Sequence, residues 1–226
     1  MSTQALDRTF YMACLDLTNR RCLVVGAGPV ALEKIEGLLA CGARVEVVAK
    51  SAIAPIRELA GSSSIRLTIK PYEADDLKGA FLVVAATSDP ATQQKVYQDA
   101  EARSMLVNVV DVPRLCNFIL PAIVRQGPIA IAISTSGASP ALAKRMKREI
   151  AQLLGPEHAR LAELLNNVRD WARAELPTYA HRREFFESIV NGTPDPIEML
   201  QRNDEESVRD LIEAAQARAK EVHLPV

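Results

Sequence analysis

The sequence lacks the features that mark several common classes of protein. Its four cysteines form no C-x-x-C pair, which argues against a zinc knuckle or a redox dithiol and favours buried thiols in a reducing compartment. No segment approaches the roughly 18 consecutive apolar residues of a membrane span. Residues 1–11 contain no apolar targeting run. A cytoplasmic protein without a membrane partner is therefore expected.

An excess of charge and a cluster of histidines are also missing. The 27 Lys and Arg residues balance 28 Asp and Glu residues, whereas nucleic-acid binders usually carry a basic excess. The three histidines, His158, His181 and His223, follow no ligand spacing and are interpreted as surface or capping residues. Neither a nucleic-acid partner nor a metal site is predicted.

Strand and helix patterns alternate through the first half of the chain. Short apolar runs predict strands at residues 21–25, 44–48, 65–69, 81–86 and 105–110, with helices at 30–40, 53–60 and 90–103 between them. The run at 81–86 is almost wholly apolar, as is typical of a central parallel strand. This alternation predicts an α/β fold with a Rossmann-type parallel sheet, and ligands of such sheets bind at the carboxyl ends of the strands.

The pattern changes after Asp111. Residues 118–124 and 129–134 predict a hairpin, Ser139-Pro140 predicts the start of a helix that runs to 154, and the rest of the chain is predicted to be helical. We expect a Rossmann domain at residues 1–112, a small α+β segment at 113–150 and a helical domain at 151–226. The middle segment is too small for its own core. It is expected to form a homodimer with a second copy; the alternative is packing on its own Rossmann domain.

A glycine-rich turn joins the first predicted strand to the first helix. In Val24-Val25-Gly26-Ala27-Gly28-Pro29-Val30-Ala31, Gly26 permits a tight turn and Gly28 leaves room for a pyrophosphate beside the backbone. Ala31 allows close packing of helix on strand, and Pro29 suits a first helical turn. The segment Gly26, Ala27, Gly28, Pro29 and Val30 is therefore predicted to bind a dinucleotide; an empty packing turn is the alternative.

Polar residues follow the other strands. In Thr87-Ser88-Asp89, a hydroxyl such as that of Thr87 is expected either to contact the ribose of a nicotinamide cofactor or to cap the next helix, and Asp89 is expected to cap the helix at 90–103. Asn108-Val109-Val110-Asp111 ends the fifth strand and places Asp111 at the mouth of the expected cleft, where a carboxylate can accept a proton. The alternative for Asp111 is a loop residue that binds backbone donors.

A hydroxyl-rich turn precedes the helix that begins at Pro140. Ser134, Thr135, Ser136 and Gly137 offer hydroxyls and free N–H groups, a combination that suits an anion. The helix then carries cations, Lys144, Arg145, Lys147 and Arg148, which either receive a polycarboxylate substrate or form a solvated face. The alternative for the turn is an ordinary helix cap.

The end of the second strand departs from the usual NAD pattern. An acidic residue is expected there for the ribose hydroxyls, but the sequence is Val47-Val48-Ala49-Lys50-Ser51. A lysine at this position would suit a 2′-phosphate, so NADP remains an alternative to NAD.

These motifs together resemble those of precorrin-2 dehydrogenases, the sirohydrochlorin synthases of siroheme and cobalamin biosynthesis, which include the N-terminal half of bifunctional siroheme synthase. The resemblance covers about residues 10–200 and depends on the order and spacing of four motifs, which are 24–31, 85–87, 108–111 and 134–140. It implies that NAD⁺ takes a hydride from precorrin-2 to give sirohydrochlorin. In some members of the family the same cleft also inserts ferrous iron, so ferrochelatase activity is an open question.

The resemblance also assigns residues. Asp111 matches the active-site aspartate of the family, which is implicated in both steps, and Pro29, Val30, Lys50 and Ser51 match its cofactor contacts. The family uses NAD despite the non-acidic residue at the end of the second strand. Asn108 and the 134–137 turn, in which Thr135 matches a family serine, are expected to bind the tetrapyrrole with Lys144 and Arg145. The family dimer interface matches the middle segment.

Two rival functions stay open. One is a regulatory nucleotide sensor, such as the ligand-binding module of a potassium-transport system, which would need neither Asp111 nor the hydroxyl-rich turn. The other is a dehydrogenase for a different small anionic substrate. The chain ends after its helical part, so we do not expect it to make precorrin-2 itself.

Overall fold

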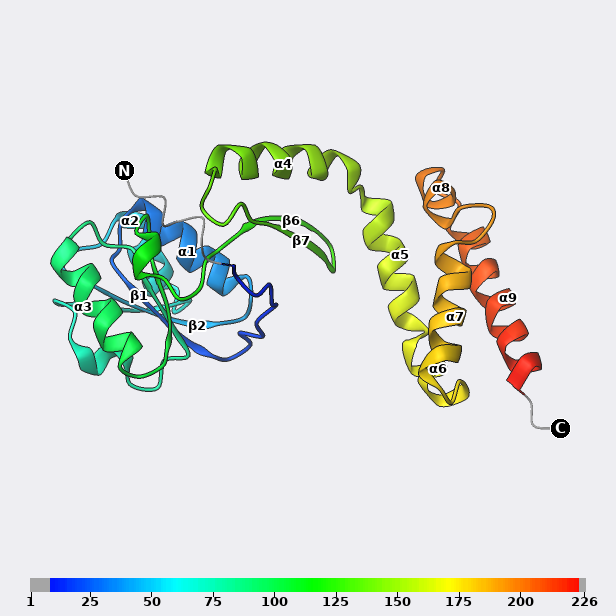
Figure 1. Cartoon of the computed structure of the whole chain (residues 1–226), viewed down its shortest axis with the longest axis horizontal. Helices are drawn as coiled ribbons and strands as arrows, with labels where there is room; N and C mark the ends of the chain where they lie inside the picture. Colours follow the sequence, from blue (N-terminus) through cyan, green and yellow to red (C-terminus); the bar gives the residue numbers. More distant parts are fainter. Residues whose placement is uncertain (1–8, 224–226) are drawn as a thin grey trace. The chain divides into compact units, whose positions relative to one another are not determined.

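Five parallel strands form the sheet of the N-terminal unit in the computed structural model, which describes residues 9–223 (Figure 1). The strands pair in the order β3-β2-β1-β4-β5. Their bounds are β1 Arg21–Val25, β2 Arg44–Ala49, β3 Arg66–Ile69, β4 Leu82–Ala85 and β5 Leu106–Val109. The predicted Rossmann-type sheet is confirmed. Its strand order places the carboxyl end of β1 between the ends of β2 and β4.

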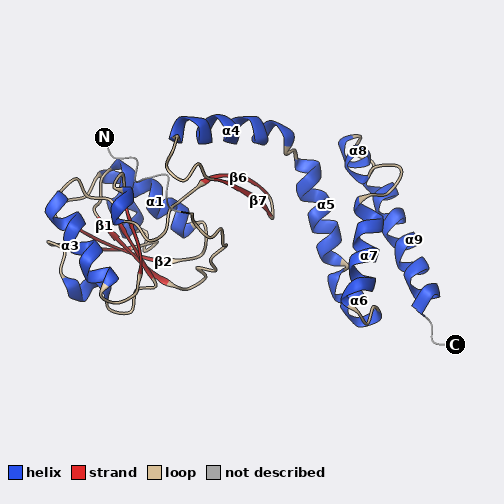
Figure 2. Ribbon diagram, in the orientation of Figure 1, coloured by secondary structure: helices blue, strands red, loops and turns tan. Residues whose placement is uncertain are grey.

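Helices cover both faces of this sheet (Figure 2). Alternate residues of β1 enter two separate cores. Val24 belongs to the core with Ile35 of α1 (Pro29–Leu39) and Ile56 of α2 (Ala54–Gly61), and Leu23 belongs to the core with Val96 of α3 (Pro90–Glu101). Each such aliphatic side chain contributes about 1.5–3 kcal/mol when it is fully buried. A strand buried on both faces is a continuous apolar run, which explains why residues 21–25 could be recognised.

The predicted helix starts at residues 89–90 and 139–140 are also confirmed. Asp89 accepts a hydrogen bond from the backbone N–H of Ala91 at 3.2 Å, and Ser139 accepts one from Leu142 at 3.2 Å. In both helices a proline follows the cap at the first helical position. The missing proline N–H costs nothing there, because the first N–H groups of a helix have no partner within it. Two short 3-10 helices, η1 (Ala74–Leu77) and η2 (Pro113–Leu115), were not predicted.

The second unit comprises Pro121–Thr135 and the chain from Ser139 onward, while Ser136–Ala138 are grouped with the first unit. It begins with the predicted antiparallel hairpin, β6 (Ala122–Gln126) and β7 (Ile129–Ile133), followed by α4 (Pro140–Leu153). The prediction that the first hairpin strand starts at residue 118 is wrong. The Phe118 carbonyl accepts a hydrogen bond from Asn108, and Pro121 has no N–H to donate to a ladder.

The remaining helices share one apolar core. Their bounds are α5 Pro156–Asn167, α6 Arg169–Glu175, α7 Tyr179–Val190, α8 Pro196–Gln201 and α9 Glu205–His223. Leu164 of α5, Phe185 and Ile189 of α7 and Ile212 of α9 are buried in it. Trp171, the single tryptophan of the chain, packs against Phe185 with ring centroids 5.1 Å apart. Tryptophan fluorescence therefore reports on this unit.

An ion pair between Arg160 of α5 and Glu205 of α9 connects the two helices, and it predicts how the stability of the unit depends on pH. Arg160 donates from Nε to Glu205 Oε2 at 2.6 Å and from Nη2 to Glu205 Oε1 at 2.7 Å, and Arg209 donates to the same carboxylate. Arg160, followed by Arg209, lowers the pKa of Glu205 to about 2. Because this folded-state pKa lies below the ordinary value of 4.5, the ion pairs stabilise the fold above pH 4.5 and are lost as the pH falls towards 2.

We expect the urea midpoint, followed by Trp171 fluorescence, to fall between pH 6 and pH 3 by less in Glu205→Gln than in the unsubstituted protein. Glu206→Gln, which removes an exposed carboxylate from the same helix, is the matched control and should keep the full pH dependence. An unchanged pH dependence in Glu205→Gln would contradict the role of the ion pairs.

The structure separates into two units at about residue 120. The predicted division of the chain into three parts, at residues 112 and 150, stays a prediction. Within residues 9–223, no helix combines the length and apolar character that crossing a membrane would require.

Candidate functional site

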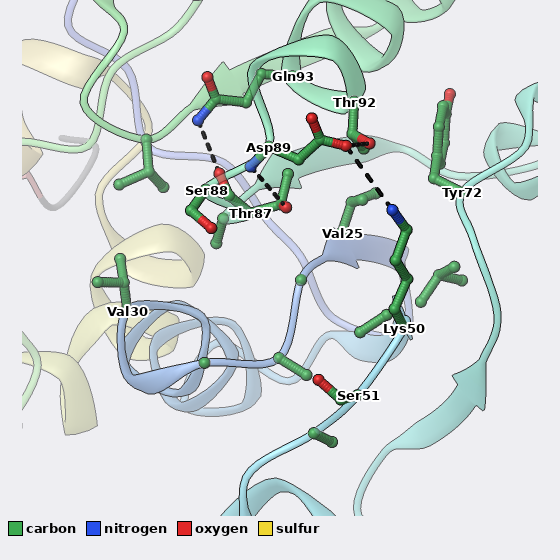
Figure 3. Close-up of a pocket in the computed structure, with 18 of the residues that line it drawn as sticks. Val25, Val30, Lys50, Ser51, Tyr72, Thr87, Ser88, Asp89, Thr92 and Gln93 are labelled. Carbon is green, nitrogen blue, oxygen red and sulfur yellow. Dashed lines mark hydrogen bonds and ion pairs between the residues drawn. The ribbon is translucent and has the colours of Figure 1, made fainter.

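A cavity of about 690 Å³ opens at the carboxyl ends of the parallel strands. Its lining comes from the first unit, from the residues at or after the end of each of the five strands, which are 25–30 for β1, 48–53 for β2, Lys70 and Tyr72 for β3, 86–89 for β4 and 110–112 for β5. The first helical turn of α3 adds Thr92 and Gln93 (Figure 3). This is the position at which ligands bind in open parallel sheets, and the volume falls in the range of small-molecule and cofactor sites.

The glycine-rich turn forms the floor of this cavity. Gly26 has φ +113°, and a Cβ built there would lie 2.5 Å from the Ala86 carbonyl oxygen and 2.9 Å from the Thr87 nitrogen. Its N–H bonds to the Val48 carbonyl at 2.9 Å, so the turn is held between β2 and β4. Gly28 differs, because a Cβ there would meet nothing within 4 Å. The lack of a side chain at Gly26 therefore allows the turn to lie close to the end of β4, whereas Gly28 leaves open space at the cavity.

The start of α1 offers unpaired donors to this open space. Gly28 is the N-cap, no described side chain caps the helix, and its first turn contains no acidic residue. The first hydrogen bond of the helix runs from the Leu32 N–H to the Gly28 carbonyl, so the N–H groups of Val30 and Ala31 have no partner within the helix. These donors and the positive end of the helix dipole suit a pyrophosphate. The residues present therefore fit a dinucleotide.

Lys50 and Asp89 point toward each other across the cavity (Figure 3). Lys50, in the loop after β2, places Nζ 4.0 Å from Oδ2 of Asp89, which follows β4. The Thr92 hydroxyl donates to Asp89 at 2.6 Å, and this bond together with the Ala91 N–H lowers the pKa of Asp89 below its usual value. Ser51, the other predicted contact after β2, also lines the cavity. This pairing of Lys50 was not predicted, because sequence order does not show that the ends of β2 and β4 flank β1.

Thr87 lies at the cavity and next to the residue that caps α3, but it does not itself form the cap. It lines the cavity, and its hydroxyl accepts the N–H of Asp89 at 3.3 Å. Asp89, and not Thr87, caps α3. The Thr87 carbonyl accepts a hydrogen bond from the Gln93 side chain at 2.7 Å, which fixes the loop against the helix. Contact between Thr87 and a cofactor ribose stays a prediction.

Asp111 lies at the cavity in a left-handed backbone conformation. Its φ is +61°, a region in which Asp and Asn are enriched among non-glycine residues and which clusters at functional sites. The N–H of Val110 bonds to Ala85 of β4 at 3.0 Å, and the N–H of Val112 bonds to Val109 at 3.2 Å. The carboxylate is exposed and shares the cavity with the glycine-rich turn.

Cys116 holds the turn that carries Asp111, and sequence analysis missed this role. Its buried thiol lies 3.2 Å from the Val109 carbonyl and 3.4 Å from the Val112 carbonyl, on either side of the aspartate. It also accepts the Val109 N–H at 3.3 Å. The local sequence does not indicate this role, because Cys116 comes close to β5 only after the chain has folded through η2.

Asn108 has a structural position. It is 8% exposed, and its side-chain amide donates to the Phe118 carbonyl at 3.0 Å. It is not among the cavity-lining residues. These contacts tie β5 to the chain that follows, and binding of substrate by Asn108 stays a prediction.

The hydroxyl-rich turn and the basic helix do not contribute to the cavity lining. Thr135 accepts the Ser139 N–H at 3.1 Å, and Ser136 and Gly137 have positive φ values of 50° and 85°. Arg145 donates to Glu149 at 2.7 Å, while Lys144 is exposed. Anion binding by Ser134, Thr135, Ser136 and Gly137 with these cations therefore stays a prediction.

Tyr72 and Lys70 line the cavity and were not predicted. The Tyr72 hydroxyl donates to Asp99 at 3.1 Å, and burial, followed by the charge of Asp99, raises the pKa of Tyr72. Both residues follow the edge strand β3, whose position beside β2 only the fold determines.

Neither of the two histidines whose side chains the structure describes lines this cavity. His158 and His181 lie half-buried in α5 and α7 of the second unit, and the side chain of His223 lies outside the described residues. Among residues 9–223 there is no group of three or more His, Cys, Asp or Glu side chains that could hold a metal ion.

Three family models match consecutive parts of the chain. Residues 13–122 match a putative NAD(P)-binding model, residues 126–153 match the central region of sirohaem biosynthesis proteins, and residues 157–215 match a sirohaem synthase dimerisation region. The last range lies C-terminal to the segment 113–150 that the sequence predicts to form the dimer. Dimer contacts in 113–150 therefore stay a prediction.

The sequence is also similar to those of curated siroheme synthases. The chain is 42% identical over 207 residues to a siroheme synthase of Methylococcus capsulatus, an alignment that covers 92% of this chain and 44% of the relative. It is 43% identical over 176 residues to siroheme synthase 1 of Cronobacter sakazakii, covering 78% and 37% of the two chains. The chain thus spans less than half the length of these relatives.

A solved structure also matches. The precorrin-2 dehydrogenase SirC superposes with a TM-score of 0.72 at 28% sequence identity, and the match covers 89% of this chain and 100% of that one.

Proposed function

This chain belongs to the family of siroheme synthases and precorrin-2 dehydrogenases, and from that premise we propose that it is an NAD-dependent oxidoreductase that converts precorrin-2 to sirohydrochlorin. One observation carries the proposal. Asp111 and a glycine-rich turn with open space at Gly28 line the same cavity. A proton acceptor and a dinucleotide-binding turn are the two parts that a dehydrogenase needs within reach of one substrate.

We assign a separate role in binding or proton transfer to each part of the cavity. Bound NAD⁺ supplies the hydride acceptor. The N–H groups at the start of α1 would hold its pyrophosphate, and the loops after β2 and β4 would hold its ribose. Oxidation of precorrin-2 removes a hydride and a proton, and the Asp111 carboxylate receives that proton or orients the ring that loses it. The turn around Cys116 keeps this carboxylate in place between Val109 and Val112.

The substrate and partners follow from the same proposal. A tetrapyrrole with many carboxylates needs cations and hydrogen-bond donors, and we assign these roles to Lys144 and Arg145 and to the Ser134–Gly137 turn. Ferrous iron is a second substrate if the cleft also metallates sirohydrochlorin. We place the reaction in the cytoplasm, since the cysteines of the described chain are all free thiols.

A homodimer is part of this proposal. On α4, Leu142, Met146 and Leu153 are 48%, 38% and 76% exposed. Where exposed apolar side chains form a contiguous patch, that patch marks a site of association between proteins. The supporting family similarity is the dimerisation region at residues 157–215.

The direct test is to incubate the purified protein with precorrin-2 and NAD⁺ and to record the absorbance of sirohydrochlorin and of NADH. We expect the two products to appear in equal amounts. Formation of neither product, with a substrate shown to be intact, would contradict the proposal. Addition of Fe²⁺ to sirohydrochlorin, with and without protein, then tests metallation separately.

A further inference from the structure

The cations of the cavity are already paired. Lys50 and Lys70 are the lysines in its lining. Lys50 faces Asp89 at 4.0 Å, and Lys70 lies 2.8 Å from Glu73 and 2.9 Å from Asp76. The lining carboxylates, Asp89 and Asp111, balance the two lysines. Among the described residues that line the cavity, each lysine has a carboxylate partner. No unpaired lysine is therefore available there to bind an additional phosphate.

The position of Lys50 makes this pairing important for cofactor choice. In folds of this kind an acidic residue near the end of the second strand binds the ribose hydroxyls of NAD, whereas a cation nearby accommodates the 2′-phosphate of NADP. A lysine after β2 would by itself favour NADP. Asp89 reaches that lysine from the end of β4, on the other side of β1.

We propose that Asp89 makes this site select NAD over NADP, because it pairs with Lys50 and so withholds that cation from a 2′-phosphate. The inference rests on the proposed function, since it requires a dinucleotide on the glycine-rich turn. The hydrogen bonds from Thr92 and Ala91 fix the carboxylate in the geometry of a helix cap, so it faces Lys50 from a rigid element. The same bonds keep the pKa of Asp89 low, and the group stays ionised at neutral pH.

Calorimetric titrations of NAD⁺ and NADP⁺ into the full chain test this selectivity without the tetrapyrrole reaction. We expect Asp89→Asn to raise the affinity for NADP⁺ relative to NAD⁺ by at least about fivefold at low ionic strength, since both groups are solvent-exposed and salt screens such pairs. Asparagine is as good an N-cap as aspartate, so α3 should keep its start. Asp75→Asn removes an exposed carboxylate outside the cavity lining and is the charge-matched control.

A second substitution identifies the mechanism. If Asp89 acts through Lys50, the double variant Lys50→Gln with Asp89→Asn should lose most of the gain in NADP⁺ affinity. An unchanged nucleotide ratio in Asp89→Asn, or a gain that persists without Lys50, overturns the inference while NAD⁺ binding by the unsubstituted protein still supports the proposed function. If the unsubstituted protein binds neither nucleotide, the proposed function itself fails.

Discussion

Asp111→Asn is expected to lower kcat for sirohydrochlorin formation by about 10²–10⁴-fold, the usual contribution of a positioned acid or base. The change removes the charge and the proton-accepting oxygen but keeps the shape of the side chain. Asparagine also tolerates the φ of +61° at this position. The turn between Val109 and Val112 should therefore remain intact, and the affinity for NAD⁺ should change by less than about twofold. Single-turnover kinetics and a nucleotide titration measure the two quantities.

The control for this experiment is Asp75→Asn, which should keep full turnover. Asp111→Ala is a less clean variant, because alanine is disfavoured at positive φ and backbone strain would accompany the loss of the carboxylate. Full activity in Asp111→Asn would contradict the catalytic assignment. Nucleotide binding together with no dehydrogenase activity in the unsubstituted protein would instead favour a regulatory nucleotide sensor.

Gly26→Ala is expected to lower the stability of the first unit, whereas Gly28→Ala is expected to weaken cofactor binding with little loss of stability. At Gly26 the new methyl group would lie 2.5 Å from the Ala86 carbonyl oxygen, and the φ of +113° is closed to alanine. Overpacking against backbone atoms and backbone strain cost about 1–3 kcal/mol each, so the first unit should lose about 2–6 kcal/mol of unfolding free energy. Scanning calorimetry measures this loss, since Trp171 reports only on the second unit.

Gly28→Ala places its methyl group where no atom lies within 4 Å. Its φ of −94° suits alanine, and alanine is a weaker N-cap than glycine, so the melting temperature should fall by no more than about 4 °C. The methyl group would occupy the space in which the pyrophosphate approaches the backbone, and NAD⁺ should bind at least about tenfold more weakly. If Gly28→Ala binds NAD⁺ normally, the cofactor does not lie on this turn.

The predicted strands and helices agree closely with the structure in the first unit, and the reason is local. In β1, four consecutive apolar residues serve two cores, so the strand is visible as a run without periodicity. The helix starts at Asp89 and Ser139 were predictable because a cap followed by proline acts within one turn. The hairpin strand at 118–124 was placed too early, because a hydrogen bond from Asn108 holds Phe118 outside the ladder.

The candidate site was predictable only in part. Gly26, Gly28 and Asp111 could be found because each stands directly after a recognisable strand. The predicted contact of Asn108 with the substrate stays a prediction, and the sequence did not show that its side-chain amide donates to the Phe118 carbonyl. Tyr72, which lines the cavity, and Cys116, which contacts the turn that carries Asp111, were missed because they lie in segments without motifs.

The sequence by itself determined the alternation of strands and helices, the glycine-rich turn and the carboxylate after the fifth strand, since these depend on neighbouring residues. Only the tertiary structure decided which strand ends lie side by side. The order β3-β2-β1-β4-β5 brings Lys50 to Asp89 across the end of β1 and brings Asp111 to the same cavity. Hydrophobic burial on both faces of the sheet drives this assembly without regard to sequence distance, so electrostatic pairs among the connecting loops emerge only once the strands have taken their places.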